Sequence, residues 1–459
     1  MAELYNVRSP WDGREAGTVS VATAADMDAA IASAHAAAKS VATIPRYQRQ
    51  TLLRCVSAAL TEQRERLAQL MVAEAGKPLQ YARTEVDRAA STFSLASDEV
   101  TRPIGEMLPL DVTAAGVGYT AIAQRRAIGV IGAISPFNFP LNLVAHKLAP
   151  AIAVGNTVVL KAAPQAPLSA FELVNIIHDA GWPKDALHVM HAPVEVAQAL
   201  ATDERIAMLS FTGSAKVGWH LKSVAGKKRV ALELGGNAAA IVCDDADLAW
   251  AAKRTALGAY AQAGQVCIKI QRIYVVRERY DAFVKLLLDE IAQLEVGDPA
   301  LESTVVGPLI DSDAAQRVAA WVDEARAAGA KVLLDGKRDG NVIGPTLLAE
   351  TKPEMKVECE EVFGPVATIA AVASADEAIT RTNESRYGLQ AGIFTYDIRT
   401  IAKAFEDLDV GGVIVNDYPS LRIDNFPYGG VKDSGFGREG VRYAMDEMSE
   451  LKVLVAKYR

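Results

Sequence analysis

The sequence predicts an α/β protein of two or three domains, each built around a sheet. The chain has 459 residues. A single hydrophobic core usually organises a domain of roughly 100–200 residues, so this chain is too long for one core. Short apolar runs ending in Gly, Pro or Ser alternate with helical stretches, which is the pattern of parallel strands joined by helical crossovers. Sheets of this kind bind ligands at the carboxyl ends of their strands.

Residues 23–100 are expected to be helical. They are rich in Ala and carry charges at helical spacing, in AADMDAAIASAHAAAKSV and in RYQRQTLLRCVSAALTEQRERLAQLMVAEAGKPL, which closes at Gly76 and Pro78. Residues 108–126, LPLDVTAAGVGYTAIAQRR, instead favour an extended hairpin, because β-prone residues flank a Gly-containing turn.

Two blocks of alternating strands and helices follow. The first contains AIGVIGAISPFNFP, GNTVVLKAAP, ALHVMHAP, IAMLSFTGS and VALELGGNAAAIV. The second contains QRIYVV, AKVLLDG, ATIAAV, AGIFTY and GGVIVND. Together they predict two α/β domains with a boundary near residues 234–238. The terminal run SELKVLVAKYR is a further strand candidate, expected to pair outside its own domain.

Composition excludes several classes of partner. The net charge of −8 disfavours nucleic acid and anionic membranes, and no apolar run approaches the roughly 20 residues that span a bilayer. The polar N-terminus lacks an apolar signal core, so we expect a cytoplasmic protein. The four cysteines show no CxxC and the six histidines no HxxxH, which predicts neither disulfides nor a metal site.

Two polar residues stand in unusual surroundings. Glu233 lies inside the otherwise apolar run VALELGG, where desolvation raises the pKa of a carboxyl group and suits it to general-base work. Asn138 lies between prolines and aromatic residues in PFNFP. It is either a turn residue or a pre-positioned hydrogen-bond donor.

Two further features are compatible with a cofactor. Lys161 ends the strand VVLK, either as a solvated lysine or as a partner of a cofactor hydroxyl or phosphate. FTGSAKVG follows a predicted strand and precedes a predicted helix, so Gly213 and Gly218 could let backbone approach a phosphate. An ordinary strand–turn–helix junction explains these glycines equally well.

In combination, these motifs resemble the NAD(P)-dependent aldehyde dehydrogenase superfamily. GAISPFNFP, LKAAP, FTGSAKVG, LELGGNAA, GQVCIKIQR, EEVFGPV and PYGGVKDSGFGREG occur in the family's order over essentially the whole chain. Glu233 precedes Cys267 by 34 residues, as the family pattern requires. The other cysteines, Cys55, Cys243 and Cys359, are interpreted as core or surface thiols.

The resemblance implies a reaction and its catalytic residues. Cys267 is the expected nucleophile, which adds to an aldehyde and forms a thiohemiacetal and then a thioester. Asn138 is the expected oxyanion donor, and Glu233 the base that activates water to hydrolyse the thioester. Coenzyme A-acylating relatives generally lack that glutamate, so this rival is disfavoured. A non-catalytic protein on the same scaffold is disfavoured by the presence of all three residues.

The resemblance also implies a nicotinamide cofactor, NAD or NADP. The expected contacts are Pro136, Phe137, Lys161, Gly213, Ser214, Gly218, Leu234, Glu361 and Phe363. Members that prefer NAD often carry a glutamate three residues after the lysine, but this chain has Pro164. No carboxylate at that position would repel a 2′-phosphate, so use of NADP is open.

The substrate is expected to be a small aldehyde. Arg422, Lys269 and Arg102 could form a cradle for a substrate anion, or they could be ordinary ion pairs. The chain most resembles the lactaldehyde, glyceraldehyde-3-phosphate, phosphonoacetaldehyde and succinic-semialdehyde branches. Val266 stands where some anion-specific members carry arginine, so a neutral tunnel for lactaldehyde or an aromatic aldehyde is the alternative.

The implied architecture has a Rossmann-like cofactor domain, an α/β catalytic domain and a β-hairpin oligomerisation arm. The expected ranges are 1–107 and 127–235 for the cofactor domain, 236–441 for the catalytic domain, and 108–126 with 450–458 for the arm. In this family the arm and last strand pair between subunits, which implies a homodimer or a homotetramer formed as a dimer of dimers.

Overall fold

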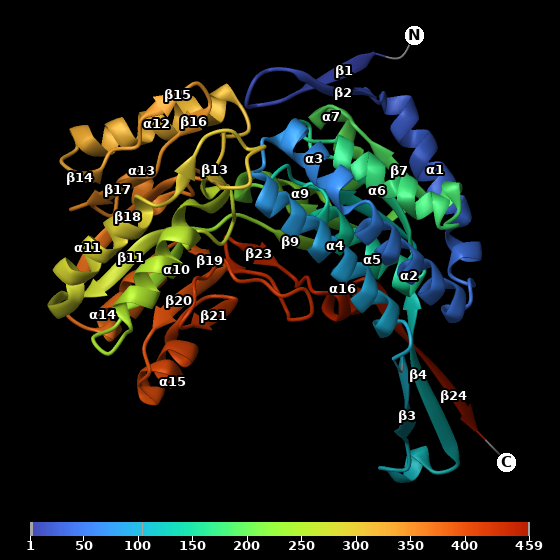
Figure 1. The fold of residues 1–459 in the computed structure, drawn as a ribbon. Coiled ribbons are helices and arrows are strands. Elements are labelled where there is room, and N and C mark those ends of the chain that lie inside the picture. Colours follow the sequence, from blue (N-terminus) through green and yellow to red (C-terminus); the bar gives the residue numbers. More distant parts are fainter. Residues whose placement is uncertain (1–2, 103, 458–459) are drawn as a thin grey trace.

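The computed structural model describes residues 3–102 and 104–457 and shows two sheet-centred lobes with a projecting arm (Figure 1). Residues 1–2, 103 and 458, which fall in the predicted ranges, lie outside the described residues. The blue-to-green half of the chain forms one lobe and the yellow-to-orange part the other (Figure 1).

The first lobe is built on a six-stranded sheet with the order β23-β9-β8-β5-β6-β7. Its strands are β5 (Val130–Ile134), β6 (Thr157–Lys161), β7 (Leu187–Met190), β8 (Ile206–Thr212), β9 (Arg229–Glu233) and β23 (Gly435–Phe436). All pairings are parallel except that of β23 with β9. The five predicted strands of the first block are therefore present.

Helices cover both faces of this sheet (Figure 1). Ile131 and Ala133 face one core while Val130 and Ile134 face the other, as expected for a strand buried on both sides. The first core is shared with α2 (Arg46–Glu62), α3 (Arg64–Ala75), α4 (Leu79–Glu99), α5 (Asn142–Val154) and α6 (Leu168–Asp179). The second is shared with α1 (Ala24–Val41) and α9 (Ala215–Val224).

The long run after residue 45 was expected as one helix and is two, because α2 ends and α3 begins at Gln63. The predicted stop is confirmed. Gly76 takes the left-handed conformation at the end of α3, with φ of 61°, and Pro78 precedes the first residue of α4.

The second lobe contains a seven-stranded sheet with the order β14-β17-β18-β11-β10-β20-β21. Its strands are β10 (Ala238–Val242), β11 (Ile270–Val276), β14 (Lys331–Leu334), β17 (Thr346–Ala349), β18 (Val366–Val372), β20 (Gln390–Phe394) and β21 (Gly412–Val415). Only β14 is antiparallel to its neighbour. One face packs against α10 (Leu248–Tyr260), α11 (Tyr280–Ile291) and α12 (Ser312–Ala327), and the other against α14 (Ala375–Asn383) and α15 (Ile398–Asp407).

The two sheets are joined at residues 234–237, between β9 and β10. The end of the chain differs from the predicted range 236–441. β23 adds to the first sheet beside β9, and α16 (Val441–Glu447) packs into the first lobe's core through Val441 and Met445. The second lobe therefore ends before residue 435.

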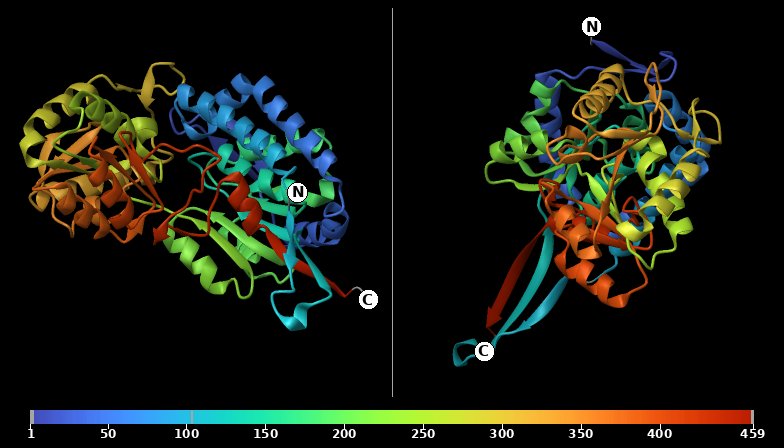
Figure 2. Two further views of the ribbon diagram at one scale, coloured as in Figure 1. Left: turned by 90° about the horizontal axis from the view of Figure 1, so that it is seen from below. Right: turned by 90° about the vertical axis from the view of Figure 1, so that its left-hand side faces the viewer.

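The arm is a three-stranded antiparallel sheet of β3 (Gly105–Pro109), β4 (Tyr119–Ala127) and β24 (Ser449–Lys457). It projects away from both lobes in Figure 1 and in the right-hand view of Figure 2. The last strand, expected to pair outside its domain, pairs with β4 of the same chain along its whole length. Within the described residues, no helix combines the length and hydropathy needed to cross a bilayer.

Candidate functional site

The predicted nucleophile lies on a tightly turned loop between α10 and β11. Gln262, Ala263 and Gly264 all have positive φ, at 55°, 54° and 67°, and Ala263 and Gln262 carry side chains that disfavour this conformation. The partly exposed Cys267 follows, with Sγ 3.1 Å from the hydroxyl oxygen of Tyr428. Burial raises the pKa of this thiol to about 12, against the lowering effect of the Tyr428 hydrogen bond. Burial therefore favours the thiol over the thiolate at neutral pH.

Asn138, after β5, is held against that loop. Its Nδ2 donates to the carbonyl of Gln265 at 3.0 Å, two residues before Cys267. Its own backbone carbonyl accepts from Nζ of Lys77 at 2.9 Å and from Nε2 of Gln262 at 2.7 Å. Lys77 in turn forms a buried ion pair with Glu85. The amide is thus fixed in orientation. One of its side-chain N–H groups donates to the Gln265 carbonyl, and the other makes no hydrogen bond with a described residue.

Glu233 ends β9 and is 5% exposed. Its Oε2 has no hydrogen-bond partner among the described residues. Burial raises its pKa well above the ordinary value and the Glu439 carboxylate raises it further, whereas Arg422 and Lys147 act in the opposite direction. Burial therefore favours the protonated form of Glu233, and the fraction in the basic form increases as the pH rises.

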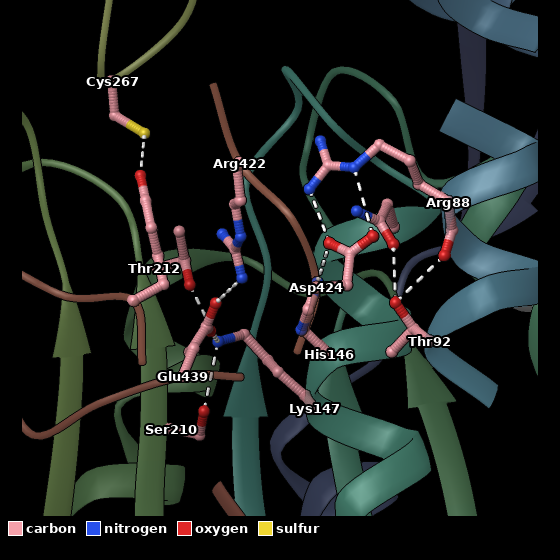
Figure 3. Close-up of polar contacts among 12 residues, drawn as sticks. Arg88, Thr92, His146, Lys147, Ser210, Thr212, Cys267, Arg422, Asp424 and Glu439 are labelled. Carbon is pink, nitrogen blue, oxygen red and sulfur yellow. Dashed lines mark hydrogen bonds and ion pairs between the residues drawn. The ribbon is translucent and has the colours of Figure 1, made fainter. Parts of the chain in front are cut away.

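Arg422 joins this group from the loop that precedes β23. Its Nη2 donates to Oε2 of Glu439 at 2.9 Å, and its guanidinium lies 3.8 Å from the centre of the Tyr428 ring. The Nε of Arg422 is buried with no partner in the described part of the chain. Glu439 also pairs with Nζ of Lys147 at 3.2 Å (Figure 3). Burial alone would raise the pKa of Glu439, but Lys147 and Arg422 lower it to about 2.

A second group of charges lies beside the first (Figure 3). Arg88 on α4 donates to Oδ1 of Asp424 at 2.6 Å, and Nε2 of His146 lies 2.8 Å from the same oxygen. Burial lowers the pKa of His146, with a further contribution from Arg422, so the imidazole is neutral. Arg88 and Arg422 therefore carry the permanent positive charge on this side of Cys267.

The turn between the lobes brings a predicted cofactor residue next to the nucleophile loop. Glu361 accepts a hydrogen bond from the backbone N–H of Gly236 at 3.0 Å, and burial raises its pKa to about 7. A side chain at Gly236 would meet the carbonyl of Cys267 at 2.6 Å, so this close approach requires glycine. Phe363 packs edge-on against Phe137, with ring centres 5.8 Å apart.

The remaining predicted cofactor residues lie at the carboxyl ends of β5, β6 and β8, at one edge of the first sheet, or on the turn after β9. They are Pro136 after β5, Lys161 at the end of β6, Gly213 and Ser214 before α9, Gly218 within α9, and Leu234 after β9. A Cβ at Gly218 would collide with Leu234, so this glycine permits close packing of helix on strand. Burial alone lowers the pKa of Lys161 to about 8, and its ammonium group has no partner among the described residues.

A nicotinamide dinucleotide fits this edge. The ammonium of Lys161 has no hydrogen-bond partner among the described residues, and the carboxyl of Glu361 is held by the backbone N–H of Gly236. The N-terminus of α9 begins at Ala215, directly after the Gly213–Ser214 turn, and a helix N-terminus favours phosphate.

Two predicted substrate residues lie elsewhere. Lys269 is buried and donates to the carbonyl of Val366, and burial lowers its pKa to about 7. Arg102 lies just after α4 at the start of the arm, half exposed, in an ion pair with Glu99 at 2.9 Å. Neither of them shares a hydrogen-bond or ion-pair partner with Arg422 among the described residues, which agrees with the ordinary ion-pair alternative for Arg102.

Other members of this group were not identified from the sequence. Tyr428 and Glu439 lie in the motif PYGGVKDSGFGREG, but nothing in the motif says that they contact Cys267 and Arg422. Lys147 lies on α5 and Lys77 on the short link between α3 and α4, and a lysine is normally solvent-exposed. Their burial, at 2% and 1% exposure, is the feature that marks them.

Comparison with known proteins identifies the family. The sequence profile described as the aldehyde dehydrogenase family matches residues 2–454. A 3-sulfolactaldehyde dehydrogenase from Priestia megaterium is 43% identical over 455 residues, which cover 99% of this chain and 95% of the relative.

Two solved structures superimpose over nearly the whole chain. Aldehyde dehydrogenase 21 from Physcomitrella patens, in complex with the reaction product succinate, has a TM-score of 0.97 and 44% identity, with 99% of this chain and 95% of that one covered. Glyceraldehyde-3-phosphate dehydrogenase GapN from Methanocaldococcus jannaschii, complexed with NADP, has a TM-score of 0.96 and 37% identity, with both chains fully covered. The predicted fold, the oxidation of an aldehyde and the NAD(P) cofactor are confirmed. The chain belongs to the aldehyde dehydrogenase family.

Proposed function

We propose that the chain oxidises a small anionic aldehyde to its carboxylic acid, with Cys267 as nucleophile, Asn138 as oxyanion donor and Glu233 as the base. The convergence of these three residues carries the proposal. Asn138 is bonded to the loop of Cys267, and the charge of Glu233 acts on the Cys267 thiol. A nucleophile with a hydrogen-bond donor and a buried carboxyl near it suits acyl chemistry through a covalent intermediate.

The first half of the reaction forms a thioester on Cys267. The thiolate adds to the aldehyde carbon, and the carbonyl oxygen becomes an alkoxide. The side-chain N–H of Asn138 and the backbone N–H of Cys267 donate to it, each worth about 3–4 kcal/mol in comparable sites. The C=O bond then re-forms as hydride leaves the carbon. NAD(P), when bound at the carboxyl edge of the first sheet, would supply the hydride acceptor.

The second half releases the acid. Glu233 takes a proton from a water molecule, and the water oxygen attacks the thioester carbon. The C–S bond breaks and Cys267 leaves as thiolate. A coenzyme A-acylating enzyme would need no base here, and the buried Glu233 with its unpartnered Oε2 therefore supports hydrolysis over acyl transfer to coenzyme A.

The charge around Tyr428 supports an anionic substrate. The cluster in Figure 3 holds three cations, Arg88, Lys147 and Arg422, and two ionised carboxylates, Asp424 and Glu439. These five groups leave one positive charge over, and burial of Glu233 disfavours the carboxylate form that would cancel it. The free Nε of Arg422 offers a donor to the substrate.

Two of the relatives are named for an anionic substrate, 3-sulfolactaldehyde in one and glyceraldehyde 3-phosphate in the other. The third was solved with the anionic product succinate. A sulfonate, phosphate or carboxylate near Arg422 and Arg88 is therefore favoured over a neutral lactaldehyde or aromatic aldehyde. Phosphonoacetaldehyde and succinic semialdehyde belong to the same chemical class.

Use of NADP as well as NAD belongs to the proposal. Lys161 has a free ammonium group, and Pro164 places no carboxylate three residues later. Nothing at this position repels a 2′-phosphate, and the GapN relative was solved with NADP.

We also propose a homodimer or a dimer of dimers in the cytoplasm. The arm exposes apolar side chains on two strands, among them Ile122, Leu451, Val453 and Leu454, which are 45–64% exposed. An apolar β surface of this kind is an aggregation liability unless a second subunit covers it.

The deciding experiment compares kcat/KM for matched anionic and neutral aldehydes. Phosphonoacetaldehyde and succinic semialdehyde would be paired with propanal and lactaldehyde, each with NAD and with NADP. A preference for the anions of about a hundredfold, or ~2.7 kcal/mol, is expected. This preference for anions should be smaller in Arg422→Lys. Lys269→Met, outside the group of charges around Arg422, is the control and should keep the preference. Equal efficiencies for both classes would contradict the anionic substrate.

A further inference from the structure

A second cavity lies at the foot of the arm, formed where α2, α4 and α16 meet the roots of β3, β4 and β24. Its volume is about 480 Å³, within the range of small-molecule sites. We call it the arm-root cavity. None of the residues assigned above to catalysis or to NAD(P) lines it.

The arm-root cavity is strongly cationic. Five arginines line it: Arg46, Arg49, Arg102, Arg125 and Arg442. Three carboxylates oppose them, and two of these are already paired, Glu99 with Arg102 at 2.9 Å and Asp446 with Arg125 at 3.0 Å. The third, Glu106, makes no ion pair with a described residue, which leaves an excess of two positive charges.

Arg46, Arg49 and Arg442 have no carboxylate partner among the described residues. Arg49 is 8% exposed, and its buried Nε has no hydrogen-bond partner there. Its Nη1 donates to the carbonyl of Ala153 at 2.7 Å, at the end of α5. Arg46 lies one helical turn earlier on α2, so the two charges repel each other across a cavity wall. The buried N–H without a partner and the repulsion between the two guanidinium groups both cost folding free energy. A bound anion would lower both costs.

We propose that the arm-root cavity binds a small organic phosphate, with the phosphate group among Arg46, Arg49 and Arg442. A phosphate monoester carries about −1.5 to −2 charge at pH 7, which matches the excess, and planar guanidinium groups bind its oxygens well. The cavity is larger than a free phosphate ion, and Ile104 and Met445 supply an apolar wall for the organic part.

The test is calorimetric titration of the intact oligomer, saturated with NADP so that the cofactor site is filled. The probes are phenyl phosphate, inorganic phosphate and phenol. Phenyl phosphate is expected to bind saturably, inorganic phosphate more weakly and phenol not at all. In the double variant Arg46→Gln/Arg442→Gln, the affinity for phenyl phosphate should fall at least tenfold. Neither residue is ion-paired in the described chain, so the fold should persist, as a thermal melt would show.

The matched control is Arg54→Gln, which removes the same charge from α2 outside the arm-root cavity, where Arg54 lies 3.8 Å from Asp98 at the surface. It should change the affinity less than twofold. Absence of saturable binding would overturn the proposal and would indicate that a second subunit fills the cavity. Unchanged binding in the double variant would overturn it too, since the probe would then sit elsewhere, as at Arg422. Equal affinity for phenyl and inorganic phosphate would overturn the organic ligand.

Discussion

The hydroxyl oxygen of Tyr428 lies 3.1 Å from Sγ of Cys267, and the guanidinium of Arg422 lies 3.8 Å from the centre of the same phenol ring. The Cys267 thiol thus contacts the Tyr428 phenol, and the phenol ring in turn contacts the Arg422 cation. The hydrogen bond lowers the thiol pKa against the larger effect of burial, and the charge of Arg422 acts in the same direction. Tyr428 is therefore placed to orient the nucleophile and to ease its ionisation.

Replacing Tyr428 with Phe removes that hydrogen bond and keeps the ring beneath Arg422. One net hydrogen bond is worth about 1 kcal/mol, so the thiolate fraction at a given pH should fall roughly fivefold. The measurement is the rate of iodoacetamide alkylation against pH, with the acid limb of kcat/KM expected to move to higher pH in parallel. An unchanged profile would mean that the Tyr428 hydroxyl has no influence on the thiol.

Cys267→Ala should abolish aldehyde oxidation and leave the fold and NAD(P) binding intact, because only the nucleophile is lost. Steady-state turnover and cofactor titration measure the two properties separately. Cys55→Ala is the control, since Cys55 is the exposed cysteine far along α2 and should retain full activity. Surviving turnover in Cys267→Ala would refute the assignment of the nucleophile.

The sequence was sufficient for the sheets and for the family, because strand periodicity and the order of the motifs can be read directly from the chain; the roles of Cys267, Glu233 and Asn138 stay a prediction. It was insufficient for side-chain direction. Lys269 lies two residues after Cys267, but a turn closed by its N–H on the carbonyl of Val266 at 3.0 Å sends the side chain to Val366 instead. Arg102 is drawn to Glu99 three residues earlier, a helix-end pairing that no motif encodes.

Contacts between distant segments were also out of reach. Tyr428 is 161 residues from Cys267, and Lys147 is 292 residues from Glu439. Only the fold decides that the loop before β23 returns to β9 and places these groups together. The same return explains why the predicted second domain ended too late.

Glu233→Gln should arrest the reaction at the thioester. The first half needs no base at this position, so one equivalent of NAD(P)H is expected per active site, followed by negligible turnover in a stopped-flow trace. In the native enzyme, burial raises the pKa of Glu233, so its basic form, and with it the hydrolysis rate, should increase as the pH rises. If the addition of coenzyme A restored rapid turnover in Glu233→Gln and acyl-CoA were the product, the coenzyme A-acylating alternative would be favoured.

Lys161→Met should weaken NADP more than NAD. A hydrogen bond to a charged group is worth about 1.5–3 kcal/mol, so KM for NADP should rise roughly tenfold to a hundredfold if the ammonium binds the 2′-phosphate. Lys184→Met, an exposed lysine of the same lobe, is the control. An equal loss for both cofactors would place Lys161 on the ribose hydroxyls alone.

Lys77→Met tests the support beneath Asn138. Lys77 forms a buried ion pair with Glu85 and donates to the Asn138 carbonyl, so the variant leaves a buried carboxylate without its cation. Removal of one partner from such a pair costs about 3–5 kcal/mol of unfolding free energy. Arg64→Met breaks an exposed pair with Asp87 and should cost less than about 1 kcal/mol. Denaturant unfolding measures both, and kcat should fall in Lys77→Met as Asn138 loses its position. Equal costs for the two variants would mean that the Lys77–Glu85 pair is hydrated in solution and does not hold Asn138 in place.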